Sequence, residues 1–294
     1  MTPSATTEAA DGLGLAAFLG AVVIGSSNFV AVRYSNRELD PLWGAGFRFA
    51  LAAAVFGLLV AALRLPLPRG RVLGLVVTYG LVGFAGAYGC LYWAMKEVPA
   101  GIAAVVLAVG PLLTLLLAVA HRMERLNGRA VAGALIAVAG SAVIFFQRSS
   151  VDFGWRSFVL LVIAALAASE SVIVSKRVGR VSPVVMNFIA MSAGAAALLV
   201  VSALAGETFA LPEAGKTQIA LVYLVAATVG LFLMVLVVVQ RWTASRTSYI
   251  FVLMPMVAVA LGALFLDERI TATTIIGGGI VCAGVYLGAL ARRA

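Results

Sequence analysis

Residues 110–140 read GPLLTLLLAVAHRMERLNGRAVAGALIAVAG, and residues 254–284 read MPMVAVALGALFLDERITATTIIGGGIVCAG. A shift of 144 residues lays the first stretch over the second without a gap, so that a proline, a Glu-Arg pair and two glycines seven residues apart coincide. Matches of this kind are rare by chance, unlike matches among Ala, Val and Leu in an apolar chain. The coincident residues are Tyr79, Gly86, Ala100, Pro111, Glu124, Arg125, Gly133 and Gly140 with Tyr223, Gly230, Ala244, Pro255, Glu268, Arg269, Gly277 and Gly284.

The repeat extends toward the N-terminus after a slippage of two residues. A shift of 142 residues superposes Ser27, Val30 and Pro41 on Ser169, Val172 and Pro183. The sequence therefore predicts two copies of one unit, spanning residues 13–146 and 157–290.

Composition sets the environment of both copies. Apolar residues make up 63% of the 294-residue chain and charged residues 11%, which is too little charge for a soluble surface of this size. A spanning helix needs about 20 apolar residues and satisfies its own backbone polar groups. The sequence predicts an all-α integral membrane protein with ten transmembrane helices at roughly 13–32, 42–63, 72–95, 102–120, 130–146, 157–174, 184–205, 218–239, 249–266 and 272–290.

Each copy contains five of these helices. Because five is odd, the second copy must enter the membrane inverted relative to the first. Inverted repeats are typical of secondary transporters, which hold their substrate near the membrane midplane between the repeats. The linkers are short and leave no room for a soluble catalytic domain.

The net charge of +9 is spread over short loops rather than gathered in one patch, so we expect no nucleic-acid partner. If the N-terminus lies inside, 13 Lys and Arg fall on the inner side and seven on the outer side, and Arg48 lies within a span. The positive-inside rule then places both termini in the cytoplasm. We expect a multi-pass protein of the bacterial inner membrane.

Glu170 is the most costly residue to bury, because an acidic side chain at the centre of a spanning helix costs about 2.5–3.5 kcal/mol. Its counterpart in the first copy is Asn28, and the neighbouring serines Ser27 and Ser169 also correspond. Two polar clusters at matching depth predict a meeting across a central cavity. Glu170 would then bind a substrate ammonium or couple protons; alternatively, it reaches toward basic residues at the inner end of its span.

Three further residues within spans allow two interpretations each. Arg48 either reaches the outer headgroups, as long basic side chains do, or binds a substrate carboxylate through paired hydrogen bonds. Pro111 and Pro255 occupy matching positions and should kink their helices. The kinks either serve gating or reflect simple helix curvature.

Glycines indicate where helices pack closely. Gly133 and Gly140, like Gly277 and Gly284, are seven residues apart and so share one helix face. We expect tight association of these two helices, as scaffold or as oligomer contact.

The sequence lacks the groups that other function classes need. His121 is the only histidine and lies in a predicted loop, where it cannot form a zinc site or a catalytic triad alone. Gly215-Lys216-Thr217 resembles the end of a phosphate-binding loop, but Ala210 stands where that motif requires glycine. We therefore expect no enzyme, no metal and no cofactor.

Three segments resemble the EamA domain of the drug/metabolite transporter superfamily. They are Val98 to Ala103 followed by Gly110-Pro111, then Glu124-Arg125-Leu126, then Gly133 to Gly140, and the second copy repeats them more weakly. The resemblance implies ten helices, cytoplasmic termini and alternating access, with export of amino acids and related metabolites.

The aromatic run Tyr88, Tyr92 and Trp93 is similar to the aromatic and neutral amino acid exporters of this superfamily, the YddG-like group. The four-helix multidrug relatives carry an acidic residue in their first helix, where this chain has Asn28, so their proton antiport is not implied.

The leading hypothesis is an exporter of small metabolites, aromatic or neutral amino acids above all, that acts as a monomer or homodimer in lipid. The first, third, fourth, sixth, eighth and ninth helices would line the cavity. A multidrug exporter of lipophilic cations by proton antiport is the alternative, and a membrane sensor without transport is a remote one. The candidate substrate contacts are Ser27, Asn28, Tyr88, Tyr92, Ser169, Glu170 and Phe232, with Pro111 and Pro255 at the gates.

Overall fold

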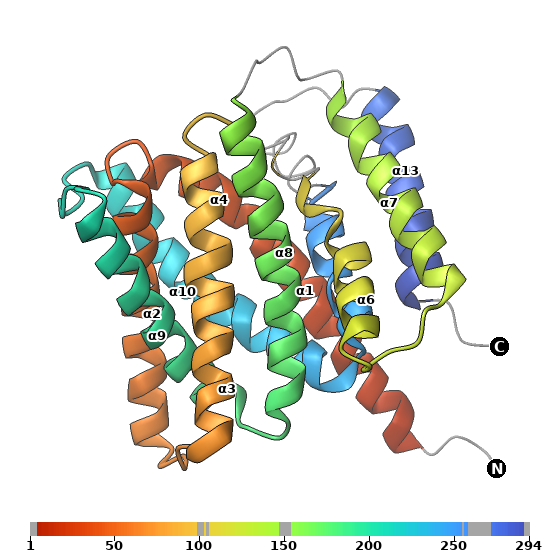
Figure 1. Cartoon of the computed structure of the whole chain (residues 1–294), viewed down its shortest axis with the longest axis horizontal. Coiled ribbons are helices and arrows are strands. Elements are labelled where there is room, and N and C mark those ends of the chain that lie inside the picture. Colours follow the sequence, from red (N-terminus) through yellow and green to blue (C-terminus); the bar gives the residue numbers. More distant parts are fainter. Residues whose placement is uncertain are drawn as a thin grey trace.

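The computed structural model describes residues 5–98, 103, 106–146, 154–254, 256–257 and 272–290, and this part of the chain is helical without any strand. The elements are α1 (Ala5–Ser35), α2 (Pro41–Ala62), α3 (Gly70–Gly80), the π-helix η1 (Leu81–Ala87), α4 (Tyr88–Ala94), α6 (Gly110–Ala120), α7 (Gly128–Phe146), α8 (Trp155–Val178), α9 (Pro183–Leu204), α10 (Gly215–Arg241), α11 (Ala244–Thr247), α13 (Ala272–Val285) and the π-helix η2 (Tyr286–Leu290). Figure 1 shows these helices side by side in one bundle.

Five helical segments within the described residues are long and apolar enough to cross a membrane. They are Pro41–Ala62, Gly70–Ala94, Trp155–Val178, Pro183–Leu204 and Gly215–Arg241, and shorter apolar stretches lie at Gly12–Asn28, Gly110–Ala120, Gly128–Val143 and Ile275–Gly288. Large apolar side chains also face outward, with Leu204 83% exposed and Ile219 72% exposed, as a surface that meets lipid requires. The prediction of an all-α, multi-pass membrane protein is confirmed. The count of ten stays a prediction, because most of 249–266 lies outside the described residues.

Local sequence sets several helix boundaries. Pro41 and Pro183, which the repeat superposes, both occupy the first turn of their helices, where a missing N–H costs nothing. Gly179 follows the last residue of α8 with φ +78°, a left-handed conformation that glycine adopts without strain. The equivalent helix starts therefore recur because the prolines recur, whereas the glycine that ends α8 corresponds to Arg37 in the first copy.

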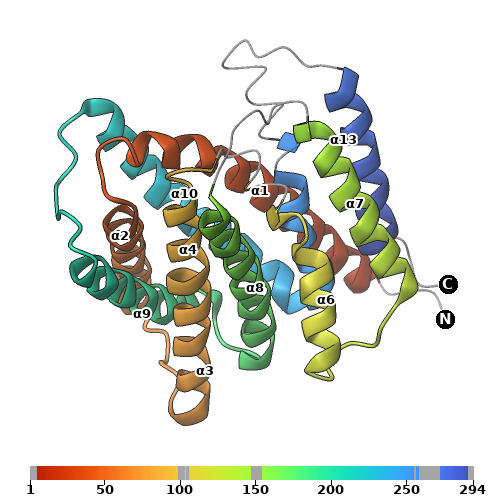
Figure 2. The same cartoon turned by 45° about the horizontal axis from the view of Figure 1, so that its top comes forward.

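The predicted association of the helices that carry the paired glycines is confirmed. A Cβ on Gly133 would lie 2.7 Å from the carbonyl oxygen of Gly284, and a Cβ on Gly140 would lie 2.8 Å from that of Gly277. The residue number falls on α13 as it rises on α7, so the two helices run antiparallel. Figures 1 and 2 show them as a pair at one edge of the bundle.

A second pair of repeat-equivalent helices, α2 and α9, also packs antiparallel. Gly46 of α2 lies against Leu199 of α9, and Gly57 lies against Phe188. The two remaining long pairs are α1 with α10, and α8 with the continuous segment α3–η1–α4. The repeat relates these two pairs to each other, since α8 is the counterpart of α1 and α10 is the counterpart of α3–η1–α4.

Pro111 differs from its prediction. It does not kink a continuous helix but lies in the first turn of α6, after a turn at Ala108 and Val109. The amides of Leu112 and Leu113 both donate to the Val109 carbonyl, at 3.0 and 3.1 Å. Proline has no N–H with which to continue the preceding helical ladder, so a new helix begins there. Pro255 lies outside the described residues.

Candidate functional site

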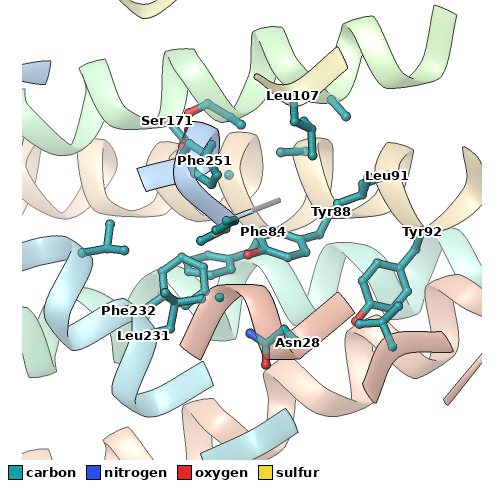
Figure 3. Close-up of a pocket in the computed structure, with 18 of the residues that line it drawn as sticks. Asn28, Phe84, Tyr88, Leu91, Tyr92, Leu107, Ser171, Leu231, Phe232 and Phe251 are labelled. Atoms are coloured by element: carbon teal, nitrogen blue, oxygen red, sulfur yellow. Dashed lines mark hydrogen bonds between the residues drawn. The ribbon is translucent and has the colours of Figure 1, made fainter. Parts of the chain in front are cut away.

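A cavity lies between the two copies, at the centre of the helices in Figure 3. Its volume is ≈ 100 Å³, whereas a cavity that holds one buried water needs roughly 10–15 Å³ by the same measure. The cavity therefore has room for a small organic molecule. Its lining comprises Gly25, Asn28, Val32, Arg48, Tyr79, Gly83, Phe84, Ala87, Tyr88, Leu91, Tyr92, Met95, Leu107, Ala164, Ala168, Ser171, Leu231, Phe232, Val235, Phe251 and Met254.

These residues come from α1, α2, α3–η1–α4, α8, α10 and the stretches around residues 107 and 251–254. Six of these sources are the helices that the repeat predicts as lining. The seventh is α2, which contributes Arg48.

Aromatic rings form one wall of the cavity. The ring centroids of Phe84 and Phe232 are 4.7 Å apart, and the Tyr88 ring lies 6.3 Å from Phe84 and 6.1 Å from Phe232. Figure 3 shows the three rings side by side, with Asn28 extending from α1 beneath them. Phe84 and Tyr88 come from the segment that includes η1, and Phe232 comes from α10, so the wall joins the two copies. Such faces accept apolar or aromatic groups.

Arg48 is the most polar group in the lining. Its side chain is 1% exposed, its Nε donates to Thr228 Oγ1 at 2.6 Å, and its Nη1 donates to the Tyr92 hydroxyl at 2.9 Å. The guanidinium carbon lies 5.3 Å from the centroid of the Phe49 ring and 6.0 Å from that of Tyr88. Nη2 is buried and has no hydrogen-bond partner in the part of the chain that the structure describes. The interpretation of Arg48 as a side chain reaching the outer headgroups is wrong, because Thr228 and Tyr92 hold it inside.

Asn28 lines the same cavity at 8% exposure, and its buried Oδ1 has no hydrogen-bond partner among the described residues. The lining, as far as the structure describes it, contains no Asp or Glu. Among the described residues, the lining therefore holds one cationic donor and one neutral acceptor without hydrogen-bond partners. The rest of the lining is mostly apolar and includes the hydroxyls of Tyr79, Tyr88, Tyr92 and Ser171.

Four of the predicted contacts, Asn28, Tyr88, Tyr92 and Phe232, are brought together in this cavity, and Ser27, Ser169 and Glu170 are not. Ser27 pairs instead with the Tyr223 hydroxyl of α10. Ser169 donates to the Gly110 carbonyl at 3.3 Å, directly before Pro111. Both serines thus fasten neighbouring helices in this conformation.

Glu170 contacts His121, which follows α6. The His121 Nε2 lies 3.0 and 3.2 Å from the two carboxylate oxygens, and the Arg177 Nη2 lies 2.8 Å from Nδ1. Arginine only donates, so Nδ1 accepts and the neutral imidazole donates to Glu170 through Nε2. The predicted meeting of Glu170 and Asn28 across the cavity is not present in this structure, because His121 satisfies the carboxylate.

The cavity is also lined by four residues that were not among the predicted contacts, Tyr79, Phe84, Ser171 and Phe251. Tyr79 could have been predicted as a lining residue from the repeat, where it matches Tyr223. Phe84 stands one turn before Tyr88 and so continues its helix face. Ser171 directly follows Glu170 and belongs to the same polar cluster of the sequence. Phe251 carries no signal that distinguishes it from ordinary residues of a spanning helix.

The antiparallel equivalent helices around an internal cavity define a class, the polytopic helical membrane proteins built from two like halves. The chain belongs to the EamA-like transporter family, whose model matches residues 12–146 and again residues 155–289. The family lies within the drug/metabolite transporter superfamily, so the resemblance of the sequence motifs is confirmed.

Two bacterial relatives whose names state a transport function match almost the whole chain. A probable amino-acid metabolite efflux pump of Escherichia coli (strain K12) is 29% identical over 92% of this chain and 93% of its own. A probable terminal-alkyne amino-acid exporter of Streptantibioticus cattleyicolor is 27% identical over 90% of each. One crystal structure superposes with a TM-score of 0.81 at 21% identity, covering 95% of this chain and 98% of its own, and supports the fold alone.

Proposed function

We propose that this protein is a secondary transporter that exports small, amino-acid-like metabolites across the bacterial inner membrane by alternating access. The observation that carries the proposal is the aromatic cavity whose wall joins Phe84 and Tyr88 of one copy to Phe232 of the other. A site between two inverted halves becomes accessible from either side when the halves rock against each other. The names of the two bacterial relatives support the same substrate class.

The proposal includes ten helices in two inverted repeats, 13–146 and 157–290, with both termini cytoplasmic and no bound cofactor. The antiparallel pairs α2 with α9 and α7 with α13 support the inversion. Asn28, Tyr88, Tyr92 and Phe232 contact the substrate, and the break at Pro111 together with Pro255 serves the gates. The working unit is a monomer or homodimer.

A counterflow screen in proteoliposomes tests the proposal. Vesicles loaded with one unlabelled compound are offered its labelled form, using phenylalanine, leucine, a nucleotide sugar and a quaternary ammonium dye. We expect accumulation of the amino acids alone. Accumulation of the dye alone supports the multidrug alternative, and tight binding without any flux supports a sensor.

A further inference from the structure

We propose that the cavity recognises the carboxylate of its substrate through Arg48, and that the substrate is a zwitterionic amino acid with an uncharged, apolar side chain. The inference rests on the proposed function and adds the chemical class of the substrate together with the residue that selects it.

The guanidinium of Arg48 carries a charge that no carboxylate among the described residues neutralises. Its two hydrogen-bond acceptors, the Thr228 and Tyr92 hydroxyls, are both neutral. No carboxylate of the described residues pairs with it, and Nη2 keeps its donors unused although it is buried. A buried charge without a counter-charge is costly. An anion that enters the cavity therefore removes this cost and gains charge-assisted hydrogen bonds.

The two hydroxyl contacts also orient the guanidinium of Arg48. Thr228 holds Nε and Tyr92 holds Nη1, so the remaining nitrogen, Nη2, is the one left for a ligand. A guanidinium fixed in this way loses little rotamer freedom on binding. Arg48 is therefore prepared for an anion before the anion arrives.

Asn28 supplies the complement for the other end of a zwitterion. Its free Oδ1 accepts from an ammonium group, and the faces of Tyr88 and Phe232 attract the same positive charge. Both interactions are weaker than a charged pair, so the carboxylate dominates recognition. The surface that remains for the substrate side chain is apolar and comes from Leu231, Phe251 and Met254.

The same charges exclude lipophilic cations. A cation in this cavity meets the uncompensated positive charge of Arg48, and no lining Asp or Glu among the described residues offsets the repulsion. The cavity thus discriminates between the two substrate classes left open by the sequence.

The first experiment varies the ligand and leaves the protein intact. Competition against labelled phenylalanine in counterflow compares phenylalanine, phenylalaninamide, 2-phenylethylamine and 3-phenylpropionate. We expect the amide and the amine, which lack the carboxylate, to compete at least about tenfold more weakly than phenylalanine. We expect 3-phenylpropionate to compete more weakly than phenylalanine and more strongly than the amide and the amine, because it keeps the carboxylate and loses the ammonium. Competition by the amide within about twofold of phenylalanine overturns the inference.

The second experiment varies Arg48. Arg48→Lys keeps the charge and loses the fork, and we expect phenylalanine to bind roughly tenfold more weakly; Arg48→Gln should weaken it about a hundredfold. The decisive readout is selectivity, since Arg48→Gln should reduce the preference for phenylalanine over its amide to about twofold or less. Glu170→Gln, outside the lining, is the matched control and should keep the preference. If Arg48→Gln is not monodisperse, the Arg48→Lys ratio and the wild-type ligand series decide.

The outcomes separate the two proposals. If no amino acid is exchanged by wild-type vesicles, the proposed function fails and this inference fails with it. If phenylalanine is exchanged and its amide competes equally, the exporter stands and the carboxylate site at Arg48 is wrong.

Discussion

At position 48, a guanidinium within the membrane-spanning bundle depends on two hydroxyl groups for its position. Thr228 Oγ1 accepts from Arg48 Nε and itself donates to the Leu224 carbonyl at 2.6 Å. Thr228→Val keeps the shape of the side chain and removes that acceptor. Because a hydrogen bond to a charged group contributes about 1.5–3 kcal/mol, we expect the affinity for phenylalanine to fall by about tenfold, measured as the concentration that half-saturates counterflow.

Thr78→Val provides the control for that substitution. Thr78 also donates to the carbonyl four residues earlier, Gly74, but it is exposed and lies outside the cavity lining. We expect wild-type affinity from this variant. Equal losses in both variants would show that the effect comes from helix stability and not from the orientation of Arg48.

Glu170 provides the opposite prediction at the same scale. Its carboxylate accepts from His121 Nε2 and does not line the cavity. Glu170→Gln retains an oxygen that accepts this hydrogen bond, so we expect phenylalanine to bind within about twofold of wild type. A loss beyond about tenfold, or an altered pH profile of transport, would mean that Glu170 reaches the substrate or a transported proton in another conformation.

The pairing of α7 with α13 depends on close backbone approach. A Cβ at Gly140 would lie 2.7 Å from the Val281 amide nitrogen and 2.8 Å from the Gly277 carbonyl oxygen, so Gly140→Ala forces the helices apart. Overpacking of this kind costs about 1–3 kcal/mol, and we expect a melting temperature several degrees lower in detergent. Gly128→Ala, on the same helix in open space, should not lower it. Equal shifts would contradict the packing argument.

Much of the arrangement of the elements was predictable from the sequence. The superposed prolines Pro41 and Pro183 mark equivalent helix starts, and the glycines Gly133 and Gly140 mark the face that packs. The break at Pro111 and the π-helix η1 were not, because hydrophobic periodicity is the same for a kinked and a broken helix. Continuity there depends on individual hydrogen bonds, such as those that Val109 accepts.

The site was less predictable than the fold. Asn28, Tyr88, Tyr92 and Phe232 followed from matching the repeats and from aromatic content, and the structure places them in one cavity. The direction of the Arg48 side chain did not follow, because it depends on Thr228, 180 positions away. Likewise, the His121 contact that satisfies Glu170 is tertiary. Motifs and periodicity along a single sequence do not reveal which distant residue will contact a buried charged side chain.

At the scale of the whole molecule, two loops at one end of the bundle connect the copies. Asp40 Oδ2, before α2, accepts from the Thr208 amide and the Thr208 hydroxyl, both at 2.9 Å, after α9. These donors hold the pKa of Asp40 below its ordinary value of 3.8. The contact therefore contributes stability above pH 3.8 and loses it as the pH falls through the lower folded pKa.

Asp40→Asn tests this connection. We expect the variant to lose less than about 1 kcal/mol of unfolding free energy at pH 7, because the group lies near the surface, and so to melt at a lower temperature. The difference from wild type should shrink as the pH falls below about 4. Glu213→Gln, the same kind of substitution in the loop that carries Thr208, should have the melting temperature of wild type at pH 7. A difference for Asp40→Asn that persists unchanged at pH 3 would contradict the assignment of the ionised carboxylate.

Orientation in the membrane is the remaining property of the whole chain that charge predicts. Leu126 lies in the loop between α6 and α7, and Leu211 lies in the loop between α9 and α10; they are 64% and 65% exposed. Figures 1 and 2 show these two loops at opposite ends of the bundle. In a chain with Cys90 and Cys282 replaced by alanine, an impermeant maleimide should label Leu211→Cys in spheroplasts, since 13 basic residues against seven place the loop of Leu126 inside. Leu126→Cys should react only after the membrane is opened. The reverse pattern would mean that the protein has the opposite orientation in the membrane, with the inner and outer gates exchanged. Labelling of both cysteines in spheroplasts would be incompatible with helices that span the membrane between the two loops.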